Sequence, residues 1–266
     1  MNLNSVDLIY FSPTRSTQKI VEAIATGINV QSTRIFDLTY PDAPATLPQE
    51  CQGDLAVIGA PVYAGRLPGT MISRFDLVKG RGVPAVIVVV YGNRAYEDAL
   101  LELHDLAVQA GFAPVASAAF VAEHSFASAE FPVAAGRPDK GDLEKARDLG
   151  ETVREKTLAI DTPQDIASPK PPGNFPYKEQ RIFAGITPSV DANLCTKCIA
   201  CVPVCPTAAI SEDDPLVIAA DLCIRCCACI ESCPTEARTM NHPKIRQIAE
   251  FLSKNCIDRK EPEIFI

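Results

Sequence analysis

The feature that most constrains this chain is a repeated run of cysteines near its C-terminal end. NLCTKCIACVPVCP (193–206) aligns without a gap on DLCIRCCACIESCP (221–234), and each copy reads C-x2-C-x2-C-x3-C-P. Nine of the eleven cysteines fall between Cys195 and Cys233. Clustered thiols indicate metal binding, because a disulfide framework normally spreads its cysteines along a small secreted chain.

The spacing within each copy has a physical purpose. Three close cysteines on a tight loop can converge on one cluster, while the fourth points the other way and completes a second cluster. On this pattern the segment from about 186 to 240 resembles bacterial two-cluster ferredoxins, and the resemblance implies two [4Fe-4S] clusters. Cluster one would take Cys195, Cys198, Cys201 and Cys233, and cluster two would take Cys223, Cys226, Cys229 and Cys205.

Two structural zinc sites are the competing interpretation of these cysteines. Zinc ribbons use paired C-x2-C knuckles, whereas both copies here are complete four-cysteine runs that end in Cys-Pro. The pattern therefore favours iron–sulfur clusters.

Cys227 is the extra cysteine of the second copy, since it aligns with Ile199 of the first. An unligated cysteine behaves as a small buried hydrophobe, so we expect a packing residue beside the cluster. A redox role or a role as an alternative ligand stays open. Cys51 and Cys256 stand alone in the sequence and are expected to be structural.

The region before the cysteines, residues 5 to 158, alternates strand-like and helix-like segments. Continuous apolar strands that alternate with helices predict a parallel sheet covered on both faces. The expected strands are 5–11, 32–38, 54–63, 83–93 and 112–122, and the expected helices are 17–28, 69–78, 95–111 and 141–157.

Four loops of this region carry unusual residues, and each follows an expected strand. In open α/β sheets ligands bind beyond the carboxyl ends of the strands. Hydroxyls and free N–H groups at a helix N-terminus suit a phosphate, although an N-cap alone would also explain Ser and Thr there. The loops are SPTRST (12–17), PVYAGRLP (61–68), YGNRAY (91–96) and EHS (123–125).

With these loops in this order, residues 4 to 158 resemble flavodoxins, which implies bound FMN. The resemblance implies that the phosphate lies against Ser12, Thr14, Arg15, Ser16 and Thr17, although flavodoxins commonly have glycine at the position of Arg15. It implies that Tyr63 or Tyr96 stacks on the flavin ring, although each alone would more often be a packing residue. The remaining contacts to the ring edges would come from Pro61, Val62, Ala64, Gly65, Arg66, Tyr91, Gly92, Asn93 and Arg94.

Three further residues have a possible role near a flavin. Arg66 and Arg94 could stabilise the anionic reduced ring, and otherwise they are solvated surface charges. His124 is the one candidate catalytic residue, and alone it would more often be a hydrogen-bonded structural histidine. No G-x-G-x-x-G follows a strand, so the sequence does not support a separate nicotinamide site.

The sequence thus predicts an α/β chain with two modules. Residues 1–160 form a flavodoxin-like, doubly wound, five-stranded parallel sheet that binds FMN. Residues 161–185 form a Pro-rich, semi-rigid linker. Residues 186–240 form a small α+β two-cluster ferredoxin-like domain. Residues 241–266 form a helix and a tail that pack on one of the modules.

The whole arrangement resembles the flavodoxin–ferredoxin fusion proteins of anaerobes. It implies an electron-transfer flavoprotein that passes electrons between two clusters and FMN, and on to a redox protein or a small-molecule donor or acceptor. A flavin-dependent reductase, with a small molecule beneath the 123–138 loop, remains an alternative. So does a two-cluster ferredoxin with a flavin-free docking domain.

The composition limits the classes of partner and the location that we expect for this protein. A net charge of −8 disfavours nucleic acid or an anionic membrane as the main partner. The longest apolar runs are too short to span a bilayer. The N-terminus lacks the basic region and cleavage site of a signal peptide. We therefore expect a cytoplasmic protein without a membrane span, and the sequence does not indicate its oligomeric state.

Overall fold

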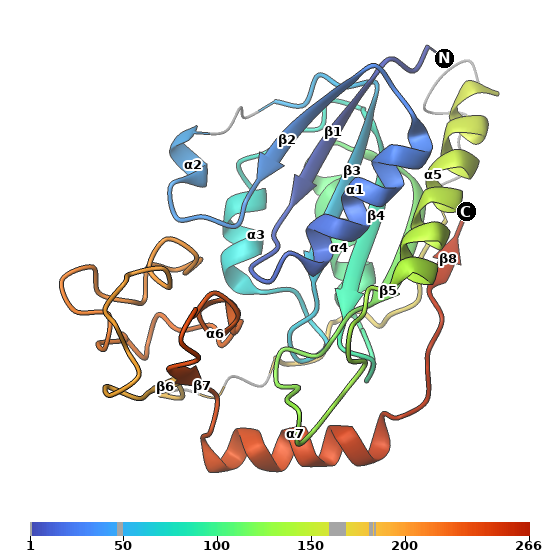
Figure 1. The fold of residues 1–266 in the computed structure, drawn as a ribbon. Helices are drawn as coiled ribbons and strands as arrows, with labels where there is room; N and C mark the ends of the chain where they lie inside the picture. Colours follow the sequence, from blue (N-terminus) through green and yellow to red (C-terminus); the bar gives the residue numbers. More distant parts are fainter. Residues whose placement is uncertain (1, 47–49, 160–168, 181–182, 184) are drawn as a thin grey trace.

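The structure is a computed structural model that describes residues 2–46, 50–159, 169–180, 183 and 185–266. An α/β domain lies beside a smaller cysteine-rich module, and the chain returns from the module to the α/β domain through its last helix (Figure 1). Parts of the predicted linker, at 161–168, 181–182 and 184, lie outside the described residues.

The α/β domain is built on a six-stranded sheet with the order β2-β1-β3-β4-β5-β8. The strands from β2 to β5 are parallel, and the central strand β4 is buried at every position. The order 2-1-3-4-5 is that of the flavodoxin-like doubly wound fold, so the predicted five-stranded parallel sheet is confirmed. The five strands are β1 (Ser5–Tyr10), β2 (Ser32–Asp37), β3 (Leu55–Pro61), β4 (Pro84–Tyr91) and β5 (Ala113–Val121).

Helices cover the two faces of the sheet in separate layers (Figure 1). On one face α1 and α5 bury residues such as Ile24 and Val153. They approach so closely that a Cβ on Gly27 would stand 2.0 Å from the carbonyl oxygen of Arg147, so glycine is required there. On the other face α3 and α4 bury residues such as Phe75. The helices are α1 (Ser16–Ile28), α2 (Ala43–Thr46), α3 (Gly69–Phe75), α4 (Ala99–Gln109) and α5 (Lys140–Leu158).

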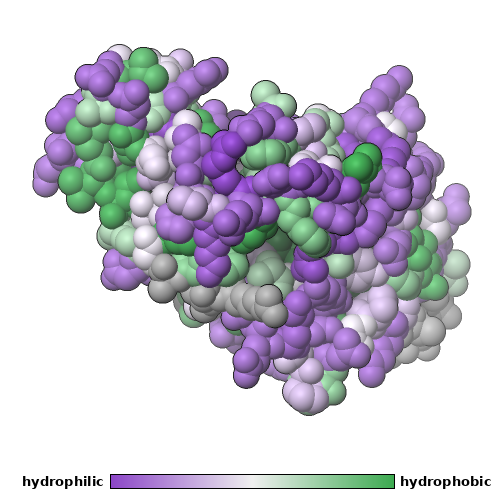
Figure 2. Space-filling model, turned by 90° about the horizontal axis from the view of Figure 1, so that it is seen from below, coloured by the Kyte–Doolittle hydropathy of each residue, from purple (hydrophilic) through white to green (hydrophobic). Residues whose placement is uncertain are grey.

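The cysteine-rich module forms a lobe at the side of the molecule (Figure 2) and repeats its backbone as well as its sequence. Left-handed residues there cost about 1–2 kcal/mol each, so their repetition indicates loops held in one shape. The pairs, each 28 positions apart, are Lys197 with Arg225, Ile199 with Cys227, and Ala208 with Glu236. The module contains β6 (Ser189–Val190) paired antiparallel with β7 (Arg238–Thr239), and the short helix α6 (Ala228–Glu231).

The C-terminal residues complete the sheet, which the sequence did not predict. Helix α7 (Pro243–Asn255) follows the module, and β8 (Glu263–Phe265) pairs antiparallel with the edge strand β5. A three-residue strand carries no periodic signal, so its partner could not be found from sequence. Among the described residues, none of the helices has both the length and the apolar character needed to cross a membrane.

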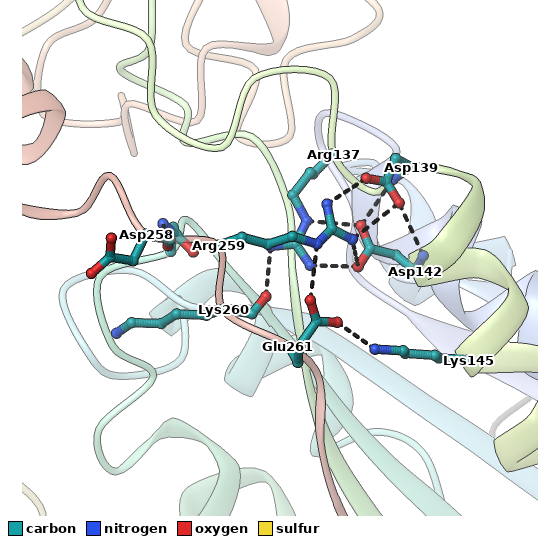
Figure 3. A network of polar contacts seen from close by, with 9 residues as sticks. Arg137, Asp139, Asp142, Lys145, Asp258, Arg259, Lys260 and Glu261 are labelled. Carbon is teal, nitrogen blue, oxygen red and sulfur yellow. Dashed lines mark hydrogen bonds and ion pairs between the residues drawn. The ribbon is translucent and has the colours of Figure 1, made fainter.

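A network of polar contacts fastens the segment before β8 to the α/β domain (Figure 3). Arg137 and Asp142 form a buried ion pair, with the Arg137 Nε 2.8 Å from a carboxylate oxygen. Arg137 also donates to the carbonyl oxygen of Lys260 at 2.7 Å, and Arg259 donates to Asp139 at 2.6 Å. The C-terminal segment is therefore held on the α/β domain by side chains as well as by strand pairing.

Candidate functional site

The eight repeated cysteines surround two cavities, four to each. Each cavity combines three thiols of one copy with the fourth thiol of the other copy, the exchange that the spacing predicts. The first cavity contains about 310 Å³ of empty space and the second about 350 Å³. The first is lined by Cys195, Cys198, Cys201 and Cys233, and the second by Cys205, Cys223, Cys226 and Cys229.

The chemistry of this donor set fits iron–sulfur clusters. Thiolates are the ligands of such clusters, and backbone N–H groups also point at the sulfurs, as where Ala209 donates to Cys205 Sγ at 3.2 Å. Burial raises the pKa of Cys226 and raises that of Cys229 to about 12, so coordination is what would deprotonate them. Within the described ranges no group of three His, Cys, Asp or Glu side chains could hold a single metal ion.

The two copies of the motif differ in exposure. Cys198 is exposed and Ile199 is 53% exposed, whereas Cys226 and Cys227 are only 8% and 3% exposed. We call the cavity that contains Cys198 the outer cavity and the cavity that contains Cys226 the inner cavity. Cys227 lines the inner cavity with the four repeated thiols, and its burial agrees with a packing role.

The inner cavity lies against the α/β domain, beyond the carboxyl end of β3. Ile224, which lines this cavity, packs against the same apolar core as Val62. Burial, and then the neighbouring Cys226 and Cys227, raises the pKa of Tyr63 well above its ordinary value. The ring of Tyr63 therefore lies beside the second copy.

Arg74 of α3 is the main polar link between the two modules. It is buried, and it donates to the carbonyl oxygens of Leu38 at 2.8 Å and Thr39 at 2.7 Å. It also donates to the carbonyl oxygen of Pro206 at 2.6 Å, directly after Cys205. Burial lowers the pKa of the guanidinium, and its bonds to three carbonyl oxygens satisfy three of its five N–H donors. The sequence analysis missed Arg74 because nothing local distinguishes it from a surface arginine.

The 12–17 loop leads into α1 as predicted for a phosphate loop, and its start is fixed by hydrogen bonds. The N–H of Ser12 donates to Thr39 Oγ1 at 2.8 Å, and the N–H of Gln18 donates to Ser12 Oγ at 3.0 Å. Arg15 has a φ of 60°, a left-handed conformation that favours glycine. Arg15, where the resemblance implied that glycine is common, thus has a backbone conformation that glycine adopts readily.

The same loop presents donors without partners. Among the described residues, no hydrogen bond engages the N–H groups of Thr14, Ser16 or Thr17. The first turn of α1 also contains no acidic side chain. Free N–H groups at the positive end of a helix are the donors that a phosphate needs, so these residues fit an FMN phosphate.

The 61–66 loop is a tight turn beside the inner cavity. Tyr63 and Arg66 exchange two backbone hydrogen bonds of 2.9 and 3.2 Å, and Ala64 and Gly65 between them have positive φ. Pro61, Val62 and Tyr63 are half-buried. Tyr63 is the one aromatic residue of this loop.

Arg66 is not a free surface charge, because its guanidinium donates three hydrogen bonds. It pairs with both carboxylate oxygens of Glu102, at 2.8 and 2.6 Å, and donates to the carbonyl oxygen of Lys178 at 2.5 Å. Beside it, the buried Asp98 accepts from the N–H groups of Asn174 and Lys178 at 2.9 and 2.8 Å. Despite burial, these bonds lower the pKa of Asp98. The loop thus anchors the described part of the linker.

The 91–96 loop is used mainly to hold the C-terminal segment. Tyr96 packs edge-on against Tyr91 at 5.4 Å, and its hydroxyl donates to Glu263 of β8 at 2.7 Å. The side-chain amide of Asn93 donates to the carbonyl oxygens of Cys256 and Asp258 at 2.8 and 2.9 Å. Of the two tyrosines predicted to stack on a flavin, Tyr96 is therefore already engaged.

His124 lies over the backbone of Gly92, where an added Cβ would come within 2.4 Å of its ring. Its Nδ1 accepts from the N–H of Phe126 at 3.0 Å. Burial, and then the positive charge of Arg94, lowers the pKa of His124 to about 4. Arg94 itself pairs with Glu97 at 2.5 Å. The imidazole is consequently neutral at pH 7, with its proton on Nε2.

Known proteins resemble parts of this chain. Residues 187–234 match the family model of the 4Fe-4S dicluster domain. A flavodoxin from the domain Archaea is 16% identical over 58% of this chain and 99% of that chain, with a TM-score of 0.37. The Streptococcus pneumonia TIGR4 flavodoxin is 17% identical over 57% and 99%, with a TM-score of 0.41.

A third solved structure is a larger protein. Rubredoxin oxygen:oxidoreductase from the anaerobe Desulfovibrio gigas is 14% identical over 59% of this chain and 36% of that chain, with a TM-score of 0.43. No curated protein matches the chain. Strand order and the family match together show a flavodoxin-like domain followed by a 4Fe-4S dicluster domain.

Proposed function

We propose that this protein is an electron-transfer iron–sulfur flavoprotein that passes electrons between two [4Fe-4S] clusters and FMN, and on to a partner. The observation that carries the proposal is the packing of the inner cavity against the Tyr63 turn. When bound, each cluster supplies single electrons, and the flavin accepts one or two. A cluster site next to a flavin loop supports transfer inside one molecule.

The cysteine-rich module would hold the clusters through the eight thiols that line the two cavities. Apolar side chains such as Ile210 and Ile218 line the inner cavity and would limit the access of water. The hydrogen bond from Ala209 to Cys205 would help to set the potential of the inner cluster. The proposed module spans residues 186–240, as the sequence predicts.

The 12–17 loop would hold the FMN phosphate. The N–H groups of Thr14, Ser16 and Thr17 would donate to it, and the positive end of α1 would favour its charge. The Thr14 and Ser16 hydroxyls add two further donors. Arg15 is exposed and adds a positive charge at the same turn.

The flavin ring would lie between the 61–66 and 91–96 loops, with Tyr63 as the aromatic side chain against it. The neutral His124 would offer an N–H from Nε2 and would not act as an acid at pH 7, because its pKa is about 4. We therefore favour a positioning role for His124 over proton donation.

The two ends of the module support a fixed arrangement. The linker before it is anchored on Asp98 and Arg66, and the chain after it is anchored on Asn93 and Arg137. Arg74 adds a buried contact in between. A module held at three places would exchange electrons with the flavin without a domain movement.

The test is anaerobic purification with flavin, iron and acid-labile sulfide quantified, followed by a redox titration. The proposal expects about one flavin and about eight irons per chain. Protein that lacks stoichiometric flavin after reconstitution would instead make this chain a two-cluster ferredoxin with a flavin-free docking domain.

A second experiment tests the phosphate loop alone. Thr14→Val combined with Ser16→Ala removes two hydroxyl donors, and charge-assisted hydrogen bonds contribute about 1.5–3 kcal/mol each. We expect FMN to bind the deflavinated variant at least about 100-fold more weakly, while riboflavin, which has no phosphate, binds unchanged. Thr26→Val, at an exposed site further along α1, is the control. Equal losses for FMN and riboflavin would contradict this placement of the phosphate.

A further inference from the structure

We propose that the outer cavity is the port through which this protein exchanges electrons with a second redox protein, and that the partner presents a positively charged docking face. The inference rests on the proposed function and adds the site at which electrons enter or leave the protein. The inner cavity lies against the α/β domain, with Cys226 and Cys227 buried, whereas the tip of the first copy, residues 196–199, is exposed throughout. An external protein can therefore approach the outer cavity more closely than the inner one.

The surface around the outer cavity has an apolar centre. Leu194, Ile199 and Val217 are 51%, 53% and 56% exposed. Ile199 lines the outer cavity, and Leu194 directly precedes its first cysteine, Cys195. In Figure 2 apolar atoms gather on the lobe that the module forms at the left, bordered by hydrophilic ones. Protein interfaces commonly have such an apolar core within a polar rim.

The rim of this surface is acidic. Residues 187–241 contain seven Asp and Glu residues against three Lys and Arg residues. Four exposed carboxylates belong to residues next to the outer cavity. Glu236 follows Thr235, which lines the cavity, and the carbonyl oxygen of Asp191 accepts from the N–H of the lining residue Cys195. Glu212 and Asp213 directly precede Asp214, which pairs with the lining residue Lys197. We call these four carboxylates and the three apolar residues the outer face.

The three cations of the module do not neutralise the outer face. Lys197 is paired with Asp214 at 3.2 Å. Arg225 donates to the carbonyl oxygen of Phe183 at 2.9 Å, and Arg238 is buried with its guanidinium directed to the carbonyl oxygen of Pro215. Both arginines keep their charge, and the four carboxylates of the outer face outnumber them. A negative rim speeds the encounter with positive partners and disfavours negative ones, so charge complementarity selects a basic redox protein.

The reaction at this port is the transfer of one electron. A reduced cluster in the outer cavity would be oxidised by one electron and the partner's metal centre reduced by one, or the reverse, and no bond forms or breaks. The inner cluster and the flavin would then exchange electrons with the outer cluster inside the molecule. The outer face thus gives the proposed electron route an external end.

The experiment uses the anaerobic, dithionite-reduced holo-protein, freed of excess dithionite, with cytochrome c as the basic acceptor. Acetylated cytochrome c, which keeps the haem and loses its lysine charges, is the matched probe. We expect native cytochrome c to be reduced about tenfold faster than the acetylated form at low ionic strength, with the difference lost in about 0.5 M salt.

Two charge-reversal variants locate the effect. Glu212→Lys with Asp213→Lys should slow the reduction of native cytochrome c about tenfold at low ionic strength. Asp148→Lys with Glu151→Lys, which makes the same charge change on the exposed side of α5, should change the rate less than twofold. Equal slowing by both variants would show a general charge effect and overturn the proposal.

Carbodiimide cross-linking gives a readout that does not depend on electron transfer. Cross-links from cytochrome c lysines should fall on Asp191, Glu212, Asp213 and Glu236, and cross-links confined to the α/β domain would overturn the port. Flavin content and internal electron transfer are measured on the same preparations. If the protein lacks flavin or shows no internal electron transfer while the outer-face variants still slow the reaction, the proposed function is wrong and the docking surface remains supported. If they hold while Glu212→Lys with Asp213→Lys has no effect, only the port is wrong.

Discussion

The two copies of the cysteine motif have the same backbone and different surroundings. Both place left-handed residues at the same positions, and the hydrogen bonds from Val202 to Ile199 and from Ile230 to Cys227 are both 2.9 Å. Yet Ile199 is 53% exposed and Cys227 is 3% exposed. The motif therefore fixes the local loop, and the neighbouring module decides which copy meets solvent.

Sequence differences between the copies match this division. The second copy has Ile224 where the first has Thr196, and Ile224 packs against the core of the α/β domain. It also has the small Cys227 where the first has the larger Ile199. An apolar side chain and a small one suit a surface that packs closely on another module.

The largest expected effect comes from removing one ligand from each cavity. In Cys226→Ser, which removes a predicted cluster ligand, we expect flavin reduction by the clusters to fall by about 100-fold or more, because changes to the outer-shell partners of a metal site alone cost about 10–100-fold. In Cys198→Ser we expect it to change only a few-fold. Anaerobic stopped-flow absorbance measures both rates, and iron analysis shows whether one cluster has been lost in each. Equal loss in the two variants would remove the functional distinction between inner and outer sites.

The next effect concerns the contact that buries the second copy. Arg74→Met leaves the carbonyl oxygen of Pro206 without its donor, and losing a buried partner costs about 2–3 kcal/mol. We expect a matching fall in the free energy of unfolding, measured in urea on the holo-protein. Arg81→Met, which removes an arginine whose side chain is 66% exposed, should cost less than about 1 kcal/mol. A fall in stability no larger than that of the control would contradict the assigned role of Arg74.

A smaller effect tests the aligned positions directly by exchanging their side chains. Cys227→Ile adds volume at a buried position and should destabilise the protein by about 1–3 kcal/mol. Ile199→Cys acts at an exposed position and should change the stability by less than about 0.5 kcal/mol. Thermal unfolding of the two holo-proteins compares them, and a greater cost for Ile199→Cys would reverse the assignment of inner and outer copies.

The smallest effect is a difference in the rate of cluster loss. Cys198 is exposed and Cys226 is buried, and the shell around a site controls access to it. Under an anaerobic chelator we expect half of the iron to leave about fivefold faster than the other half. Absorbance and iron release follow the two phases. In Ile199→Cys the fast phase should remain, whereas a single phase in the unmodified protein would contradict the asymmetry.

Much of this architecture could be predicted from the sequence because its signals are local. The apolar run at 83–91 indicated a buried strand, and β4 is buried from Pro84 to Tyr91. The spacing of the cysteines indicated how the two copies exchange their fourth thiols, and the structure groups the eight cysteines in that way. That these thiols hold clusters stays a prediction.

The rest depends on contacts between residues far apart in the chain. Tyr96 was predicted as one of two tyrosines near a flavin, which stays a prediction, and its hydroxyl donates to Glu263, which lies 167 positions later. Arg74 meets Pro206 across 132 positions. Neither pairing produces a periodic or spaced pattern, so only the folded chain shows that Tyr96 holds the C-terminal strand and that Arg74 joins the two modules.

The central claim is that electrons pass between the clusters and the flavin inside one molecule. The most direct measurement is the rate of flavin reduction after the clusters of the anaerobic protein receive less than one electron per chain, recorded over a wide range of protein concentrations. The account predicts a rate that does not change with concentration. A rate that rises in proportion to concentration would show that electrons travel between molecules and would contradict it.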